Sequence, residues 1–241
     1  DEAEPLFLKT LETQKRVLGD DHQDTLGTMS ELAALYTDRS RYDDAEPLLL
    51  EAFERQRRVL GHDHPDTLGT MNNLASLYND QGRYDEAEGL LLEAYERQTG
   101  VLGNDHPETL RSMNLLGGLY SNTGRLEQAA TLLQEVLSRR LKVLGEDHPH
   151  VGDSYYSLGC LAAARANHAE SIAYLRQALE LGWSRASILR DPGLDSMRGD
   201  PDFESIVTEV KVRLGMERPE QHGAPPTRQS SAWPERTKPV E

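Results

Sequence analysis

A short phrase recurs four times in this chain at a constant interval. Val-Leu-Gly-x-Asp-His begins at residues 17, 59, 101 and 143, so each copy lies 42 residues after the one before. A fixed period of this size is typical of stacked supersecondary units, each of which contacts mainly its neighbours. Such an array does not build the single enclosed core in which a catalytic centre is usually found. The repeat therefore favours binding over catalysis.

One repeat, residues 65–103, is predicted to form two antiparallel helices. A first helix is indicated by apolar and small residues spaced three and four apart, namely Leu68, Met71, Leu74, Ala75, Leu77 and Tyr78. Pro65 suits the first turn of this helix, and Gly82 interrupts the pattern. A second helix follows from Tyr84, and Gly103 ends it. Two helices cannot bury their apolar stripes alone, so we predict an all-α solenoid of stacked hairpins.

The period divides the chain into seven segments. Residues 1–19 match only the second helix of a repeat, and its unpaired apolar face could support self-association. Full repeats follow at 20–61, 62–103 and 104–145, then a degenerate one at 146–182. Residues 183–214, with two Asp-Pro pairs and a last amphipathic stretch, are predicted to form a helical cap. Residues 215–241 contain many prolines and are predicted to be a disordered tail.

The repeat resembles a known family. Leu74-Ala75, Tyr78, Gly82, Tyr84, Ala87 and Ala94 are similar to the signature of the tetratricopeptide repeat, whose usual length is about 34 residues. The longer unit resembles the 42-residue variant of kinesin light chains and of many bacterial tetratricopeptide proteins. This resemblance implies a right-handed superhelix with a C-terminal helical cap, whose concave groove binds proteins or extended peptides. It covers residues 1 to about 182.

Composition excludes several other classes. The chain has 241 residues, a net charge of −15 and a hydrophobic share of 37%. No apolar run of about 18 residues is present, so we predict no membrane span. The acidic charge repels phosphate backbones and anionic lipids, which argues against nucleic acid and membrane surfaces as partners. The lone Cys160 excludes an internal disulfide and fits a cytoplasmic protein.

The recurring histidines suggest a metal site at first sight. A metal needs three or four ligands within about 2–2.5 Å, whereas equivalent positions of stacked units lie roughly 10 Å apart. We therefore interpret His22, His64, His106 and His148 as parts of a loop that ends one helix and starts the next. The sequence also contains no phosphate-binding loop, nucleophile elbow or metalloprotease motif. It predicts no catalytic residue, no metal and no cofactor.

The predicted groove carries the candidate binding residues. By the family resemblance, ligands contact side chains around the Leu-Ala pair of each first helix, and Asn amides there can bond a peptide backbone of any sequence. Arg111 is the only basic residue in the set, which argues against a clamp for a terminal carboxylate. The acidic groups of Glu31, Asp38, Asp80 and Asp153 favour a ligand with basic character. The predicted groove residues are Ser30, Glu31, Asp38, Asn72, Asn73, Ser76, Asn79, Asp80, Arg111, Asn114, Asn122 and Tyr156.

Three functions remain open at this level. The first is a protein-binding scaffold or adaptor that uses the groove. The second is the C-terminal regulatory region of a larger signalling enzyme, such as a serine/threonine kinase or a signalling ATPase, because similar arrays follow such domains. The third is a self-association module.

Overall fold

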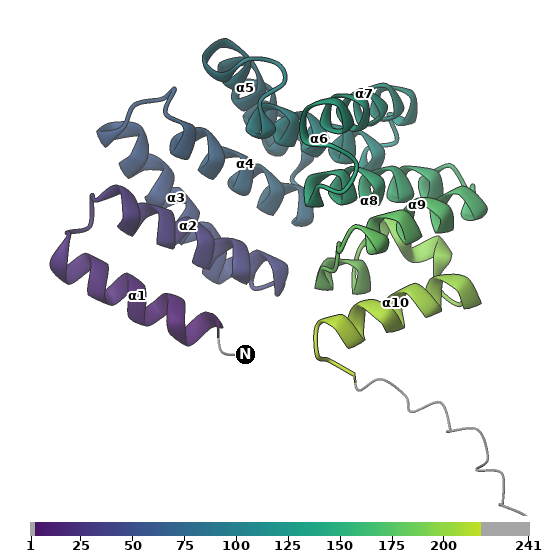
Figure 1. Cartoon of the computed structure of the whole chain (residues 1–241). Coiled ribbons are helices and arrows are strands. Elements are labelled where there is room, and N and C mark those ends of the chain that lie inside the picture. The colour runs from purple at the N-terminus through teal and green to yellow at the C-terminus, as the bar shows by residue number, and fades with distance from the viewer. Residues whose placement is uncertain (1–2, 218–241) are drawn as a thin grey trace, which may run out of the picture.

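The computed structural model describes residues 3–217 and consists of stacked helical hairpins (Figure 1). No strand occurs between residues 3 and 217. The α-helices are α1 (Ala3–Val17), α2 (Gln23–Asp38), α3 (Tyr42–Val59), α4 (Pro65–Asp80), α5 (Tyr84–Leu102), α6 (Pro107–Asn122), α7 (Leu126–Leu144), α8 (Pro149–Ala164), α9 (His168–Glu180) and α10 (Pro201–Arg213). Two 3₁₀-helices, η1 (Ala186–Leu189) and η2 (Pro192–Met197), precede α10. The predicted all-α solenoid is confirmed.

The first helices of successive repeats form one wall of the array. Helices α2, α4, α6 and α8 each pack on the next, while α3, α5 and α7 connect them and pack on both neighbours. In Figure 1 the array curves, with α5 and α7 on its outer side and the last helices turning back towards the first ones. We call the side lined by the first helices the inner face. Between residues 3 and 217, none of the helices combines the length and the apolar character that a membrane span requires.

The recurring Asp-His phrase has a structural explanation in every repeat. The histidine of each repeated motif accepts, at its Nδ1 atom, a hydrogen bond of 3.2 Å from the backbone N–H two residues later. These histidines are His22, His64, His106 and His148. This bond caps the first helix, whose initial N–H groups lack a partner inside the helix. In the first three units the preceding Asp also pairs with an Arg of the following second helix, for example Asp63 with Arg97 at 2.7 Å. Among the described residues, no cluster of His, Cys, Asp or Glu could hold a metal ion.

A three-residue clasp joins neighbouring repeats. The Arg83 guanidinium lies 3.8 Å from the centre of the Tyr78 ring and 2.7 Å from Glu46 of the previous second helix. A cation over an aromatic ring contributes about 0.5–1 kcal/mol at an exposed site. The same clasp recurs as Glu4, Tyr36 and Arg41, and as Glu88, Tyr120 and Arg125. It is missing from the fourth unit, where Ala130, Ala162 and Asn167 stand at these positions.

The segment after α9 packs on the last repeat. Ile188 of η1, Leu194 and Met197 of η2, and Phe203 of α10 are fully buried in one cluster with side chains of α9. Asp200 accepts hydrogen bonds from the first backbone N–H groups of α10 and so starts this helix. Most of the predicted tail, residues 218–241, lies outside the described residues.

Candidate functional site

Four positions on each first helix line the inner face. Along α2 they are residues 27, 31, 34 and 38, spaced by about one turn so that they share a line along the helix. The equivalent residues are 69, 73, 76 and 80 on α4, 111, 115, 118 and 122 on α6, and 153, 157, 160 and 164 on α8. Each of these sixteen residues keeps part of its surface accessible to solvent. Within this set lie the predicted residues Glu31, Asp38, Asn73, Ser76, Asp80, Arg111 and Asn122.

Two predicted residues are wrong as surface contacts, because they lie inside the array. Asn72 is fully buried and Ser30 is 7% exposed. Each residue advances about 100° around a helix, so Asn72 and Asn73 cannot both face the same side. Position 72 turns towards the next first helix, where the Ser112 hydroxyl reaches the Asn72 and Gln98 amides. Ser30 similarly bonds Thr70 on the neighbouring helix at 2.9 Å. Both side chains hold first helices together.

Tyr156 is covered by the chain's own C-terminal segment. The Trp183 ring stacks on the Tyr156 ring with 4.0 Å between their centres. The Tyr156 hydroxyl donates a 2.5 Å hydrogen bond to Asp191, and the Cys160 thiol lies 3.5 Å from the same carboxylate oxygen. Burial, reinforced by the Asp191 carboxylate, raises the pKa values of Tyr156 and Cys160 well above their usual ranges. The structure therefore assigns Tyr156 to the attachment of the cap.

The other predicted polar residues form bonds between adjacent first helices. Arg111 donates to the Asn73 side chain at 2.6 Å, and Asn122 donates to Asn79 at 3.0 Å, so both pairs join α4 to α6. Asn114 donates to Ser157 of α8 at 2.9 Å, while its side-chain oxygen is buried without a partner. These bonds hold the Asn and Arg groups in fixed positions on the inner face.

Two carboxylates, Asp38 and Asp80, lie where α2 and α4 end, and a third, Glu31, lies in the middle of α2. Glu31, Asp38 and Asp80 are exposed, and none of them forms an ion pair with a described residue. The surrounding inner wall displaces water from Asp80 and raises its pKa to about 6, with smaller contributions from the Asp191 and Asp38 carboxylates. The same desolvation raises the pKa of Asp38, which Arg185 opposes. The two ends of the array thus approach each other closely enough for their charges to interact.

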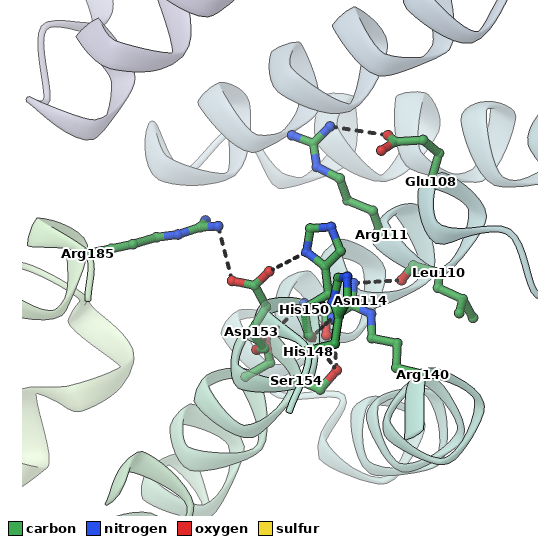
Figure 2. Close-up of polar contacts among 11 residues, drawn as sticks. Glu108, Leu110, Arg111, Asn114, Arg140, His148, His150, Asp153, Ser154 and Arg185 are labelled. Carbon is green, nitrogen blue, oxygen red and sulfur yellow. Dashed lines mark hydrogen bonds and ion pairs between the residues drawn. The ribbon is translucent and has the colours of Figure 1, made fainter. Parts of the chain in front are cut away.

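Sequence reasoning missed two arginines near Arg111, namely Arg140 on α7 and Arg185 in the segment after α9 (Figure 2). Arg185 pairs with Asp153 at 3.0 Å, and His150 contacts the other oxygen of that carboxylate, also at 3.0 Å. Arg140 is 2% exposed and donates to the His150 carbonyl at 2.7 Å and to the Ser154 hydroxyl at 2.9 Å. Burial, together with Arg111 and Arg185, lowers the pKa of Arg140 to about 10.

A sequence signal for Arg140 did exist. It stands 42 residues after Gln98 and 84 after Gln56, both of which are also buried in second helices. A charged residue at a position that is a buried Gln in the earlier repeats indicates that its surroundings differ from those in the other repeats. Arg185, in contrast, lies outside the repeats, so no period could place it on the inner face.

The comparison with known families rests on the same repeating units. The family model described as tetratricopeptide repeat matches residues 1–49, 24–88, 66–142 and 119–182, which together span most of the chain. The chain belongs to the tetratricopeptide repeat family. A comparison with curated proteins gives no match.

Solved structures of other tetratricopeptide repeat proteins share this architecture. A variant form of a Podosopora anserina kinesin light chain protein with nearly identical TPR-like repeats is 28% identical, with a TM-score of 0.55, over 75% of this chain and 85% of that one. Another structure of that protein gives 26% identity and a TM-score of 0.53, over 79% and 88%. BtubC (BKLC) from P. vanneervenii is 20% identical with a TM-score of 0.60, over 97% of both chains, and shows the fold alone. The predicted resemblance to kinesin light chain-like repeats is confirmed.

Proposed function

We propose that this tetratricopeptide repeat array is a protein-interaction scaffold whose inner face, from α2 to α6, binds an extended peptide with basic side chains. The observation that carries the proposal is the set of exposed carboxylates of Glu31, Asp38 and Asp80, which have no ion-pair partner among the described residues. Exposed acidic residues elsewhere on the repeats are commonly paired, as Asp21 and Asp63 are. Carboxylates without an ion-pair partner are available to cationic groups of a ligand, even where, as at Asp80, a neighbouring amide donates a hydrogen bond.

The amides beside these carboxylates supply a second kind of contact. Asn73 and Asn79 are half-buried and held by bonds to α6, so little side-chain entropy is lost when a ligand binds to them. A backbone N–H or C=O of an extended peptide matches their donor and acceptor groups. Small residues between the polar positions, Ala34, Ser76 and Gly118, leave room for a chain to lie across the helices.

A charge-matched pair of variants tests this proposal. The inner-face variant carries Glu31→Gln, Asp38→Asn and Asp80→Asn. The control carries Asp20→Asn, Glu96→Gln and Glu146→Gln, which remove the same charge from exposed positions off the inner face. Binding of fluorescent peptides that differ in Lys and Arg content is measured by anisotropy. We expect basic peptides to bind, and the inner-face variant to lose at least about tenfold in affinity, or 1.4 kcal/mol, with the control unchanged. Equal affinity for both variants would place the interface elsewhere.

Self-association stays a second prediction, supported by one observation. Leu6, Leu8 and Val17 of α1 are 63%, 47% and 66% exposed. Sedimentation velocity over a concentration series, with Leu6→Glu as the comparison, tests it. A sedimentation coefficient that does not change with concentration would exclude it.

A further inference from the structure

The link between η1 and η2 runs across the ends of the first helices. At α8, Asp191 accepts hydrogen bonds from Tyr156 and Cys160. A Cβ placed on Gly193 would lie 3.9 Å from the Asn122 side-chain oxygen, at the end of α6. The four residues from Arg190 to Gly193 therefore follow the edge of the inner face at which the first helices end. We call this segment the strap.

The strap reaches the opposite end of the array through one side chain. The Arg190 guanidinium donates to the Ser40 hydroxyl at 3.2 Å and to the Arg39 carbonyl at 3.4 Å, both in the turn between α2 and α3. About 150 residues separate these partners in the sequence. This contact joins the first complete repeat to the segment that follows the last one.

The residue at the receiving turn is unusual for its backbone conformation. Ser40 has a φ of 57°, in the left-handed region that disfavours side chains, as does the equivalent Ala166 of the fourth unit, whereas the equivalent Gly82 and Gly124 have φ values of 76° and 75°. A glycine at position 40 would relieve the backbone but would offer no hydroxyl to Arg190. The serine thus places an acceptor where the other repeats have none.

The residues on either side of the strap are buried in the cap, whereas the Arg190 side chain is exposed and can detach from its acceptors. Trp183, Ile188, Leu194 and Met197 are buried in the cluster that joins the cap to the last repeat. Arg190 itself is exposed, and its two acceptors belong to a separate part of the array. Loss of the Arg190 contact would therefore leave the cap in place and free the two ends of the array to move apart.

We propose that Arg190 and Ser40 form an intramolecular latch that closes the edge of the inner face. With the latch formed, the ends of α2, α4, α6 and α8 lie behind the strap, next to Asp38, Asp80 and Asn122. One consequence rests on the proposed function: a peptide that lies along these helix ends enters or leaves when the latch opens. The latch itself requires no ligand, so its test is independent of peptide binding.

Distances between spin labels on the two sides of the latch test the proposal. Labels at Asp43→Cys, at the start of α3, and Ser196→Cys, in η2, are placed on exposed residues in a Cys160→Ser background, and double electron–electron resonance gives their distance distribution. We expect a single narrow distribution with the latch intact. Arg190→Ala should broaden it and shift it to longer distances. Ser40→Gly, which removes the shorter of the two contacts, should give a smaller shift in the same direction.

The control is Arg176→Ala, which breaks an exposed ion pair between α9 and α10 (2.7 Å to Asp202) without touching the strap. Its distribution should match that of the unmutated protein, and circular dichroism should show the same helix content in all variants. If Ser40 only shapes the turn, Ser40→Gly raises the urea midpoint and leaves the distances unchanged. Distributions for Arg190→Ala and Ser40→Gly that superimpose on the original would overturn the latch.

Discussion

The contact between the two helices of the third repeat allows a sharp prediction at two adjacent glycines. Gly117 and Gly118 both lie in α6, but only Gly117 faces α7. A Cβ at Gly117 would lie 2.5 Å from Cδ2 and 2.6 Å from Cγ of Leu133, which is fully buried, whereas a Cβ at Gly118 would meet nothing within 4 Å. We predict opposite effects of Gly117→Ala and Gly118→Ala on the free energy of unfolding.

The magnitudes follow from two competing terms. Replacing Gly by Ala inside a helix stabilises it by about 1 kcal/mol at either position. Overpacking at Gly117 costs about 1–3 kcal/mol, because the fully buried Leu133 side chain must shift within a packed interior to admit the methyl group. We therefore expect Gly118→Ala to gain about 1 kcal/mol and Gly117→Ala to lose about 0–2 kcal/mol. The difference between the variants isolates the packing term, since both share the same gain in helix propensity.

Urea unfolding followed by far-UV circular dichroism measures this difference. The slope of the free energy with urea should be the same in both variants, which shows that the unfolded states are comparable. Equal stability of Gly117→Ala and Gly118→Ala would refute the reasoning. It would mean that α6 and α7 can separate without cost, towards the spacing of the earlier repeats, where Ala33 and Ala75 occupy the same position.

Three further predictions concern buried or crowded ionisable groups. Arg140→Gln, which introduces the residue found at Gln56 and Gln98, should raise the unfolding free energy at pH 7 by up to about 3 kcal/mol. Burial lowers the pKa of Arg140 to about 10, so the charged form of this side chain is disfavoured in the folded state. A decrease in the unfolding free energy, measured by urea, would contradict this. Asp80→Asn should stabilise the protein slightly at pH 7 and not at pH 4. The folded pKa of Asp80 is about 6, above the usual 3.8, so the stability due to its protonated carboxyl is lost as the pH rises through 6. A difference in urea midpoint between the variant and the unmutated protein that is equal at both pH values would exclude this. Cys160 should react slowly with a thiol reagent at pH 8. Asp191→Asn should speed this reaction, because it removes a nearby negative charge that raises the pKa of the thiol. An unchanged rate would show that only the access of the reagent to the thiol limits the reaction.

Much of the fold could be predicted because its determinants are local and repeated. Leu74, Ala75 and Tyr78 mark one face of a helix by their spacing, and Gly103 marks a helix end by its freedom to adopt positive φ. The same pattern returns at 42-residue intervals, so one correct interpretation applies to every unit. The clasp of Glu46, Tyr78 and Arg83 was not predicted, although its members also repeat, because it joins three helices whose relative placement the spacing does not give.

The candidate site was predictable only to the level of the helix. The sequence placed Asn72 and Asn73 together because both precede the Leu-Ala pair, yet one is fully buried and the other is half-buried on the inner face. The 100° turn between neighbours makes one of them point at the next helix, and the direction depends on how the hairpins pack. Arg111 could be identified as a polar residue on that wall, but not as a partner of Asn73.

The sequence by itself determined the hairpins, their number and the side on which polar residues gather, because hydrophobic period and helix-ending residues act over a few turns of chain. Only the tertiary structure decided that Arg190 meets Ser40 and that Trp183 covers Tyr156. These contacts depend on the accumulated curvature of the stacked repeats, to which every packing angle contributes a small amount. A contact across about 150 residues therefore has no signature in the repeat that carries it.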